Sequence, residues 1–197
     1  PPRSTPKPSS AASDVYKRQQ EVFIENVGQP TLACIRPAVD ALQDLNSHRE
    51  VQLIISGGIR NGADVAKALA LGADAVSIGS AAMIAIGDND PKWEKEYEKL
   101  GSKAGAYDDW HEGNDPAGIS TQKPELMKRL DPKKAGRKLS NYLKVMSLEA
   151  QTIARACGKN SLHNLEPEDL CALTVEAAAM ARVPLAGTSW IPGIKKK

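Results

Sequence analysis

The sequence is poor in cysteine, in long apolar runs and in net charge. It has only three cysteines, Cys34, Cys157 and Cys171, and no two of them stand in the short C-x-x-C spacing of metal and redox motifs. Each falls in a stretch whose pattern indicates a helix. We therefore expect three small, buried, apolar residues in a reducing compartment.

Membrane insertion, secretion and binding to polyanions are also disfavoured. No apolar run approaches the roughly 20 residues that a membrane span requires. No charged-then-apolar leader of the signal-peptide kind is seen, so the cytoplasm is the expected location. The 26 Lys and Arg residues are balanced by 24 Asp and Glu residues, and three of the lysines form the run 195–197. The body of the chain is thus near neutral, and neither a nucleic acid nor an anionic membrane is an expected partner.

Residues 1–19 are expected to lie outside any core. They contain four prolines and five serines or threonines and almost no periodic apolar positions. Such a segment cannot bury enough surface to offset the entropy of ordering it. Its end, SDVYKRQ, resembles adapter-derived translated sequence, which predicts a non-native leader; a basic disordered arm is the alternative. The domain proper is expected over residues 20–197.

A regular alternation of helices and strands follows this leader. Residues 51–56, VQLIIS, and residues 75–78 are short apolar runs typical of strands buried on both faces. Asn61 can cap the helix between them, and Gly72 can end it. A helix before the first strand is predicted from Leu32, Ile35, Val39, Leu42 and Leu45, with Pro37 either kinking it or lying in its first turn. The order predicts parallel strands with right-handed crossovers.

Glycine-rich loops follow both predicted strands. The first reads Ser56-Gly57-Gly58-Ile59-Arg60, and the second begins at Gly79-Ser80. Glycine lets backbone N–H groups approach an anion closely, and a helix start adds partial positive charge. One such loop alone is more often an ordinary strand-to-helix turn, but two on consecutive strands favour a shared phosphate site, as after strands seven and eight of β/α barrels. Arg60 either adds a charge-assisted contact or points to solvent.

Two long helices are predicted after these loops. An apolar face runs from Leu139 to Cys157, where Gly158 ends the helix. Pro167 is predicted to open a second helix, with Leu170, Leu173, Ala177 and Met180 on its buried side. Core packing is the expected role of both faces.

A closed β/α barrel requires eight strands and about 250 residues. Only two convincing strands are visible, with a possible remnant at residues 22–24. The fold class predicted is therefore α/β: the last two strands of a TIM (β/α)8 barrel, followed by an α-helical extension, as an incomplete barrel.

The same residues resemble a known family. The matching blocks are Ile55-Ser-Gly-Gly-Ile-Arg60, the run from Gly62 to Val76, and Ile78-Gly-Ser80. They look like the last two strands of the flavin barrel of glutamate synthase, with a similarity extending over residues 20–193. The resemblance implies that FMN phosphate is bound through backbone amides at Ser56, Gly57, Gly58, Ile59, Gly79 and Ser80, with Arg60 beside them.

One departure from the family pattern concerns its iron–sulfur cluster. Family members hold it on three cysteines before a Pro-x-Gly-Ile-x-Thr-Gln tail. The tail is present at residues 116–122, but Ala104, Trp110 and Asp115 stand at the aligned cysteine positions. Because thiolates hold such clusters, the cluster is predicted to be absent. The loop 107–112 is expected to be polar and hydrogen-bonded and not a metal site, since its histidine lacks the partner of an H-E-x-x-H helix.

The resemblance implies an FMN-dependent oxidoreductase that forms glutamate from 2-oxoglutarate and an amino donor, with partner subunits for glutaminase or electron transfer. Loss of the cluster favours a subgroup similar to the glutamate-synthase-like subunit of N-methylglutamate synthase, whose donor is an amine. No catalytic residue is assigned, because barrel enzymes draw catalytic groups from several strands, and the fragment alone is expected to be inactive. A non-redox phosphate-binding barrel and a non-catalytic scaffold subunit remain as alternatives.

Overall fold

The computed structural model describes residues 28–107, 109 and 112–194. Its elements, in chain order, are α3 (Thr31–Asp44), β1 (Ile54–Ser56), α4 (Gly62–Ala70), β2 (Ala75–Ser77), α5 (Ser80–Ile86), η1 (Pro91–Trp93), α6 (Glu94–Lys99), α7 (Pro124–Met127), α8 (Pro132–Ala156), η3 (Leu162–Asn164), η4 (Pro167–Asp169) and α9 (Val175–Ala181). This mixture of helices with a parallel sheet confirms the predicted α/β class. The expected leader 1–19 and the possible strand 22–24 lie outside the described residues.

The sheet consists of β1 and β2, which pair in parallel with Ile54 opposite Ala75 and Ser56 opposite Ser77. The helix α4 connects them, as the sequence pattern predicts. The expectation that both strands are buried on both faces is wrong, because Ile55 is buried whereas the side chain of Ile54 is 61% exposed. Within the described residues each strand has one neighbour, so the outer edges and one face of this small sheet have nothing to pack against.

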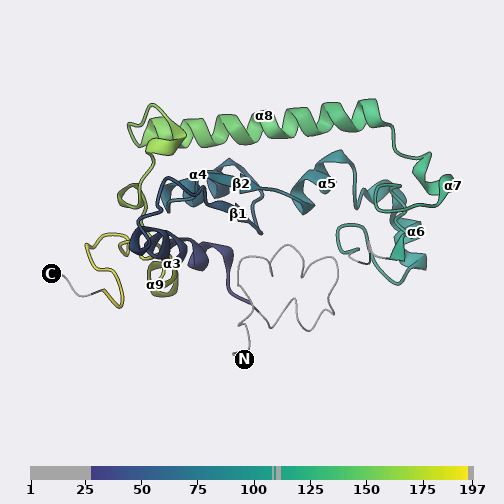
Figure 1. Cartoon of the computed structure of the whole chain (residues 1–197). Coiled ribbons are helices and arrows are strands. Elements are labelled where there is room, and N and C mark those ends of the chain that lie inside the picture. Colours follow the sequence, from purple (N-terminus) through teal and green to yellow (C-terminus); the bar gives the residue numbers. More distant parts are fainter. Residues whose placement is uncertain (1–27, 108, 110–111, 195–197) are drawn as a thin grey trace.

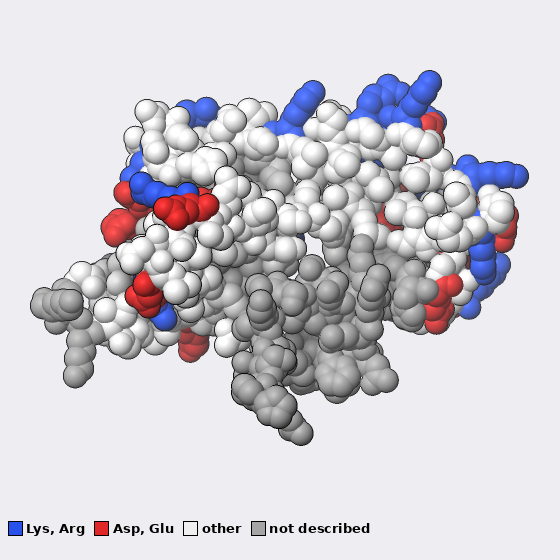
Figure 2. Space-filling model, viewed as in Figure 1, with Lys and Arg blue, Asp and Glu red and all other residues white. Residues whose placement is uncertain are grey.

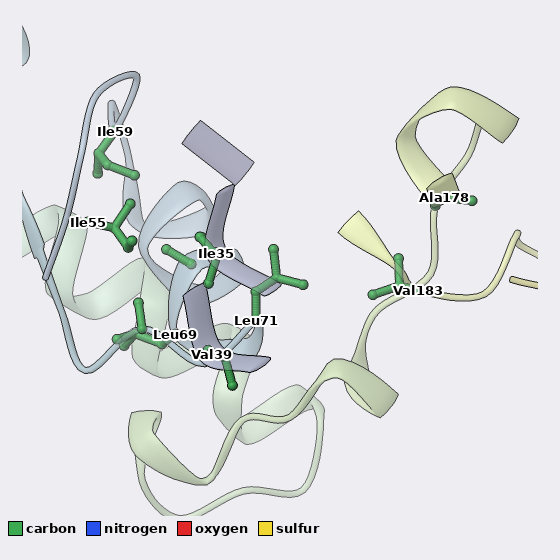
Figure 3. Packing of buried hydrophobic residues seen from close by; sticks show 11 residues of the cluster. Ile35, Val39, Ile55, Ile59, Leu69, Leu71, Ala178 and Val183 are labelled. Carbon is green, nitrogen blue, oxygen red and sulfur yellow. The ribbon is translucent and has the colours of Figure 1, made fainter. Parts of the chain in front are cut away.

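The main core lies between α3, the sheet and the end of α4 (Figure 3). Ile35 and Val39 of α3 meet Ile55 of β1 and Leu69 and Leu71 at the end of α4. Burial of each such side chain is worth about 1.5–3 kcal/mol. The C-terminal segment closes this core with Ala172, Ala178 and Val183.

The helix α4 is buried on two sides, which explains its richness in alanine. Ala68 faces the main core, while Ala66 and Ala70 form a second cluster with Ala154 of α8 and Leu165. Small side chains let α8 approach closely, and α8 runs along the outside of both α4 and α5 (Figure 1).

Pro37 lies inside α3, which begins at Thr31 and continues to Asp44. The sequence allowed this proline either to kink the helix or to lie in its first turn. The second alternative is wrong, because Pro37 lies beyond the first turn. Only the centre of the predicted apolar face is deeply buried, because Leu45 lies beyond the helix end and is 72% exposed.

The long helix α8 begins earlier than its apolar pattern suggests. Asp131 caps it by accepting hydrogen bonds from the backbone N–H groups of Lys133 and Lys134, and Pro132 occupies the first turn, where its missing N–H costs nothing. The predicted end at Gly158, with φ +72°, is confirmed. Exposed Lys and Arg side chains gather where α8 begins (Figure 2), at Lys133, Lys134, Arg137 and Lys138.

The prediction of one helix that begins at Pro167 is wrong. A capping box between Glu166 and Asp169 closes the one turn of η4, and the chain then extends until Thr174 caps α9. Leu173 consequently points to solvent with 86% of its surface exposed, and Met180 is 45% exposed. Two local caps in succession override the apolar periodicity that suggested one helix.

The cysteines differ in part from expectation. Cys34 and Cys157 are half-buried, whereas Cys171 is exposed. Cys171 also lies between η4 and α9 and not in a helix, because the predicted helix is interrupted there. Among the described residues, every helix is either too short or too polar to cross a membrane.

Candidate functional site

Both glycine loops leave the sheet at the same edge. Ser56 and Ser77 are register partners at the ends of parallel strands, and neighbouring strands lie about 4.8 Å apart. The first loop turns through Gly57 and Gly58 with φ of +108° and +73°. A side chain would be strained at either position, so this turn requires the two glycines that the sequence provides.

The loops offer hydrogen-bond donors beside open space. A Cβ added at Gly58 or Gly79 would meet no atom within 4 Å. Within the described part of the chain, no side chain or loop carbonyl accepts a hydrogen bond from the backbone N–H of Gly58, Ile59 or Gly79. Ser80 opens α5, and among the described residues the backbone N–H groups of Ser80 and Ala81 have no acceptor, as is usual for the first residues of a helix. The arrangement suits a ligand oxygen that accepts several N–H groups.

The start of α4, by contrast, is already satisfied by protein groups. The side chain of Asn61 accepts from Asp64 N at 2.9 Å, and Glu149 of α8 accepts from Gly62 N at 2.8 Å. Asp64 in turn accepts from both the backbone N–H and the Nε of Arg60, whose side chain is 77% exposed. Two carboxylates, those of Asp64 and Glu149, therefore already lie at the partial positive charge of this helix start. Arg60 is paired with Asp64.

A cavity of about 280 Å³ lies beside the first loop. It is lined by Gly57, Gly58 and Ile59 of the loop and also by Thr31 of α3 and Met180 of α9. Gly79 and Ser80 do not line this cavity and remain at the neighbouring strand end. The hydroxyl of Thr31 also donates to the Ser56 carbonyl at 3.3 Å, which ties α3 to the end of β1.

Sequence reasoning missed the residues that hold this loop from outside. The hydroxyl of Tyr142 on α8 donates to the Arg60 carbonyl, and Glu149 accepts from Gly62. Burial, and after it the nearby carboxylates of Asp64 and Glu149, raises the pKa of Tyr142, so its hydroxyl keeps its proton. No local signal could reveal these contacts, since they join positions 82 and 87 residues apart.

Asp115, aligned with the third cysteine position, organises the tail segment. Its side chain is fully buried and accepts hydrogen bonds from the backbone N–H groups of Ala117, Ile119 and Ser120 at 2.8–2.9 Å. The Tyr97 hydroxyl lies 3.5 Å from the same carboxylate. A buried carboxylate requires such donors, so this aspartate fixes the course of the Pro-Ala-Gly-Ile-Ser-Thr-Gln segment.

Two tyrosines enclose this region in a small aromatic core. The rings of Tyr97 and Tyr107 lie 5.4 Å apart, and both side chains are buried. Burial, followed by the charge of Asp109, raises the pKa of Tyr107 to about 12. Burial, followed by the charge of Asp115, raises the pKa of Tyr97 as well. Ala104, at the first cysteine position, is half-buried against this core, and Trp110, at the second, lies outside the described residues.

The expected polar loop over residues 107–112 is described only in part. The Tyr107 hydroxyl donates to the Asp109 carbonyl at 3.0 Å, and Glu112 accepts from Asn114 at 3.3 Å. Across residues 28–107, 109 and 112–194, no group of three His, Cys, Asp or Glu side chains is arranged to hold a metal ion.

The fold and the two loops define an α/β protein with a candidate phosphate site at the carboxyl ends of parallel strands. Residues 18–91 and 106–160 match the family model described as the conserved region in glutamate synthase. The chain belongs to this family.

Individual relatives agree with the family assignment. A glutamate synthase large subunit-like protein of Rhizobium meliloti is 83% identical over 174 residues, which cover 88% of this chain and 39% of the relative. An archaeal glutamate synthase (NADPH) of Methanocaldococcus jannaschii is 39% identical over 74% of this chain and 25% of its own length. An inosine-5'-monophosphate dehydrogenase of Rhizobium tropici is 44% identical over 69 residues, or 35% of this chain and 13% of that protein. The chain thus spans two fifths or less of these relatives.

Proposed function

We propose that the protein carrying this chain is an FMN-dependent oxidoreductase of the glutamate synthase type, which forms glutamate from 2-oxoglutarate and an amino donor. The observation that carries the proposal is the pair of glycine loops at one edge of a parallel sheet, with N–H donors beside open space at Gly58 and Gly79. Membership of the family supports the same activity.

The chain's own residues would hold the phosphate end of the cofactor. Backbone amides of Gly57, Gly58, Ile59, Gly79 and Ser80 are the proposed donors. Ser56 belongs to this set through its place at the end of β1, where Thr31 holds its carbonyl. Arg60 contributes little, because its guanidinium pairs with Asp64. When bound, the flavin supplies the electron-transfer chemistry, while the protein supplies position and charge.

We propose that the full-length protein contains the rest of the barrel. The outer edges of β1 and β2 would pair with further strands of a TIM barrel, and the rest of the barrel would cover the exposed Ile54 side chain. Upstream residues would supply those strands together with the substrate pocket, and partner subunits would provide glutaminase or electron-transfer functions. The setting proposed is the cytoplasm.

The iron–sulfur cluster is proposed to be absent. A buried aspartate with three backbone donors replaces a thiolate at position 115, and Ala104 has no ligand atom. This feature favours the subgroup similar to the N-methylglutamate synthase subunit, in which the donor is an amine. Analysis of iron and labile sulfide in the purified full-length protein is the test, and stoichiometric iron with sulfide would contradict the proposal.

The decisive experiment for the phosphate site compares FMN with riboflavin, which lacks the phosphate. The full-length protein should purify with FMN and bind riboflavin at least tenfold more weakly, a difference of about 1.4 kcal/mol or more. Gly58→Ala should lower FMN affinity, because the added methyl group enters the space proposed for the phosphate. Gly101→Ala is the matched control, since Gly101 has φ +76°, close to the +73° of Gly58, and equally open surroundings.

A second candidate function is a barrel that binds a different phosphate ester. The loops recognise a phosphate whatever group carries it, and the named substrate of the Rhizobium tropici relative is a nucleoside monophosphate. Competition of FMN against inosine monophosphate and sugar phosphates separates the two. Displacement of FMN at equal or lower concentration by one of these esters would favour the second function, and binding of neither class would favour a scaffold role.

A further inference from the structure

The end of the loop between β1 and α4 is fastened to α8 by three contacts at two positions, Arg60 and Gly62. The Tyr142 hydroxyl donates to the carbonyl of Arg60, and the Glu149 carboxylate accepts from the backbone N–H of Gly62 at 2.8 Å. Gly62 itself touches the backbone of α8 so closely that a Cβ there would lie 2.3 Å from Met146 O. Carbonyl, amide and backbone packing together fix the last residues of the loop.

The α8 residues that make these contacts lie outside the cavity, although Arg60 itself lines it. Thr31 and Met180 line the cavity that borders Gly57 and Gly58, whereas neither Tyr142 nor any other residue of α8 lines it. The loop is thus held at its end by α8 and borders the cavity at its glycines. Its two glycines are flexible in the absence of such support, because glycine loses more conformational freedom on ordering than any other residue.

We infer that Tyr142 and Glu149 of the long helix α8 are positioning residues that hold the amides of Gly57, Gly58 and Ile59 in the orientation required to bind a phosphate. The inference rests on the proposed function of this loop. Both residues act through the backbone of the loop and touch no ligand themselves.

The side-chain chemistry of each residue fits this role. A tyrosine hydroxyl held protonated is a donor that the Arg60 carbonyl can always use. The Glu149 carboxylate accepts the Gly62 N–H and so fixes the backbone at the point where the loop enters α4.

The test uses two measurements on the full-length protein. The first is hydrogen exchange, without ligand, of the two amides that have acceptors: Arg60 N–H, which donates to Asp64, and Gly62 N–H, which donates to Glu149. The second is the ratio of FMN to riboflavin affinity. Tyr142→Phe and Glu149→Leu should each accelerate exchange at these two amides about fivefold or more. They should lower FMN affinity by five- to tenfold and change riboflavin affinity by less than twofold. Glu149→Gln keeps an acceptor oxygen for Gly62 and should restore the ratio.

Ile153→Ala is the matched control on the same helix. Ile153 is half-buried against Ala66, Ala70 and Leu165, so the variant loses stability without touching the loop, and its FMN to riboflavin ratio should equal that of the unmodified protein. If Tyr142→Phe and Glu149→Leu behave like Ile153→Ala, with normal loop exchange and a normal ratio, the inference is overturned while the proposed function stands. If the unmodified protein does not prefer FMN, the proposed function and the phosphate role both fail, and the exchange data alone report whether α8 holds the loop.

Discussion

The carboxylate of Glu149 on α8 accepts a hydrogen bond at 2.8 Å from the backbone N–H of Gly62, the first residue of α4. This bond joins positions 87 residues apart and places a negative charge at a helix start, where it is stabilising. At the same place the two backbones lie close together, which requires the small residues that α4 presents to α8: Gly62, Ala66 and Ala70.

Gly62→Ala should destabilise the protein strongly. The new methyl group would lie 2.3 Å from Met146 O and 2.4 Å from Glu149 Cβ, so α4 and α8 must move apart. Overpacking of this kind costs about 1–3 kcal/mol, occasionally more. Urea unfolding followed by far-UV circular dichroism measures the loss.

Gly136→Ala provides the control for this prediction. Gly136 is inside α8, and a Cβ there meets nothing within 4 Å. Alanine should therefore stabilise the helix by about 0.5–1 kcal/mol through its higher helix propensity. Equal effects of the two substitutions would contradict the close approach of α4 and α8.

Asp115→Asn should loosen the tail segment. An amide can accept hydrogen bonds at only one of its two terminal atoms, so at least one of the three backbone N–H donors loses its partner. Hydrogen bonds to a charged group are worth about 1.5–3 kcal/mol each, and a loss of at least 1.5 kcal/mol in the free energy of unfolding is expected. Asp109→Asn is the comparison, because Asp109 receives the Tyr107 hydroxyl through its backbone carbonyl. Equal stability of the two variants would show that the Asp115 carboxylate is dispensable.

Alkaline conditions should destabilise the aromatic core before its tyrosines ionise. Burial raises the pKa of Tyr107 from 10.0 to about 12, and Tyr97 is shifted in the same direction. Above pH 10 the unfolded chain releases these protons while the folded chain retains them, so the free energy of unfolding falls as pH rises toward 12. Urea midpoints below and above pH 10 should show this decline, and it should be smaller in Tyr107→Phe. A decline of the same size in that variant would exclude Tyr107 as its source.

Asn61→Ala should remove the cap of α4. The Asn61 side chain accepts from Asp64 N at 2.9 Å, and loss of such a cap costs about 1 kcal/mol. Asn61→Asp keeps the acceptor but adds a third carboxylate beside Asp64 and Glu149, so it should not exceed the stability of the unmodified protein. A clear gain in stability for Asn61→Asp would show that those two carboxylates do not lie at this helix start.

Several elements could be predicted from the sequence because their signals act over a few residues. Asn61 at the start of α4, Gly72 after its end and Gly158 after α8 set helix boundaries through local backbone geometry, and the structure confirms them. The strands predicted at residues 51–56 and 75–78 also appear as neighbouring parallel strands, although they are shorter than predicted, at residues 54–56 and 75–77. The prediction failed after Pro167, where a capping box and a second cap at Thr174 interrupted an apolar period.

The sequence by itself determined the glycine turns and the order of strands and helices, since φ preferences and side-chain periodicity are properties of neighbouring residues. Only the tertiary structure decided that Tyr142 and Glu149 form hydrogen bonds with the backbone of Arg60 and Gly62, that Arg60 pairs with Asp64, and that Asp115 is a buried acceptor. The physical reason is that these roles depend on how closely two backbones approach. That distance is set by packing of the whole chain and is not encoded at any single position.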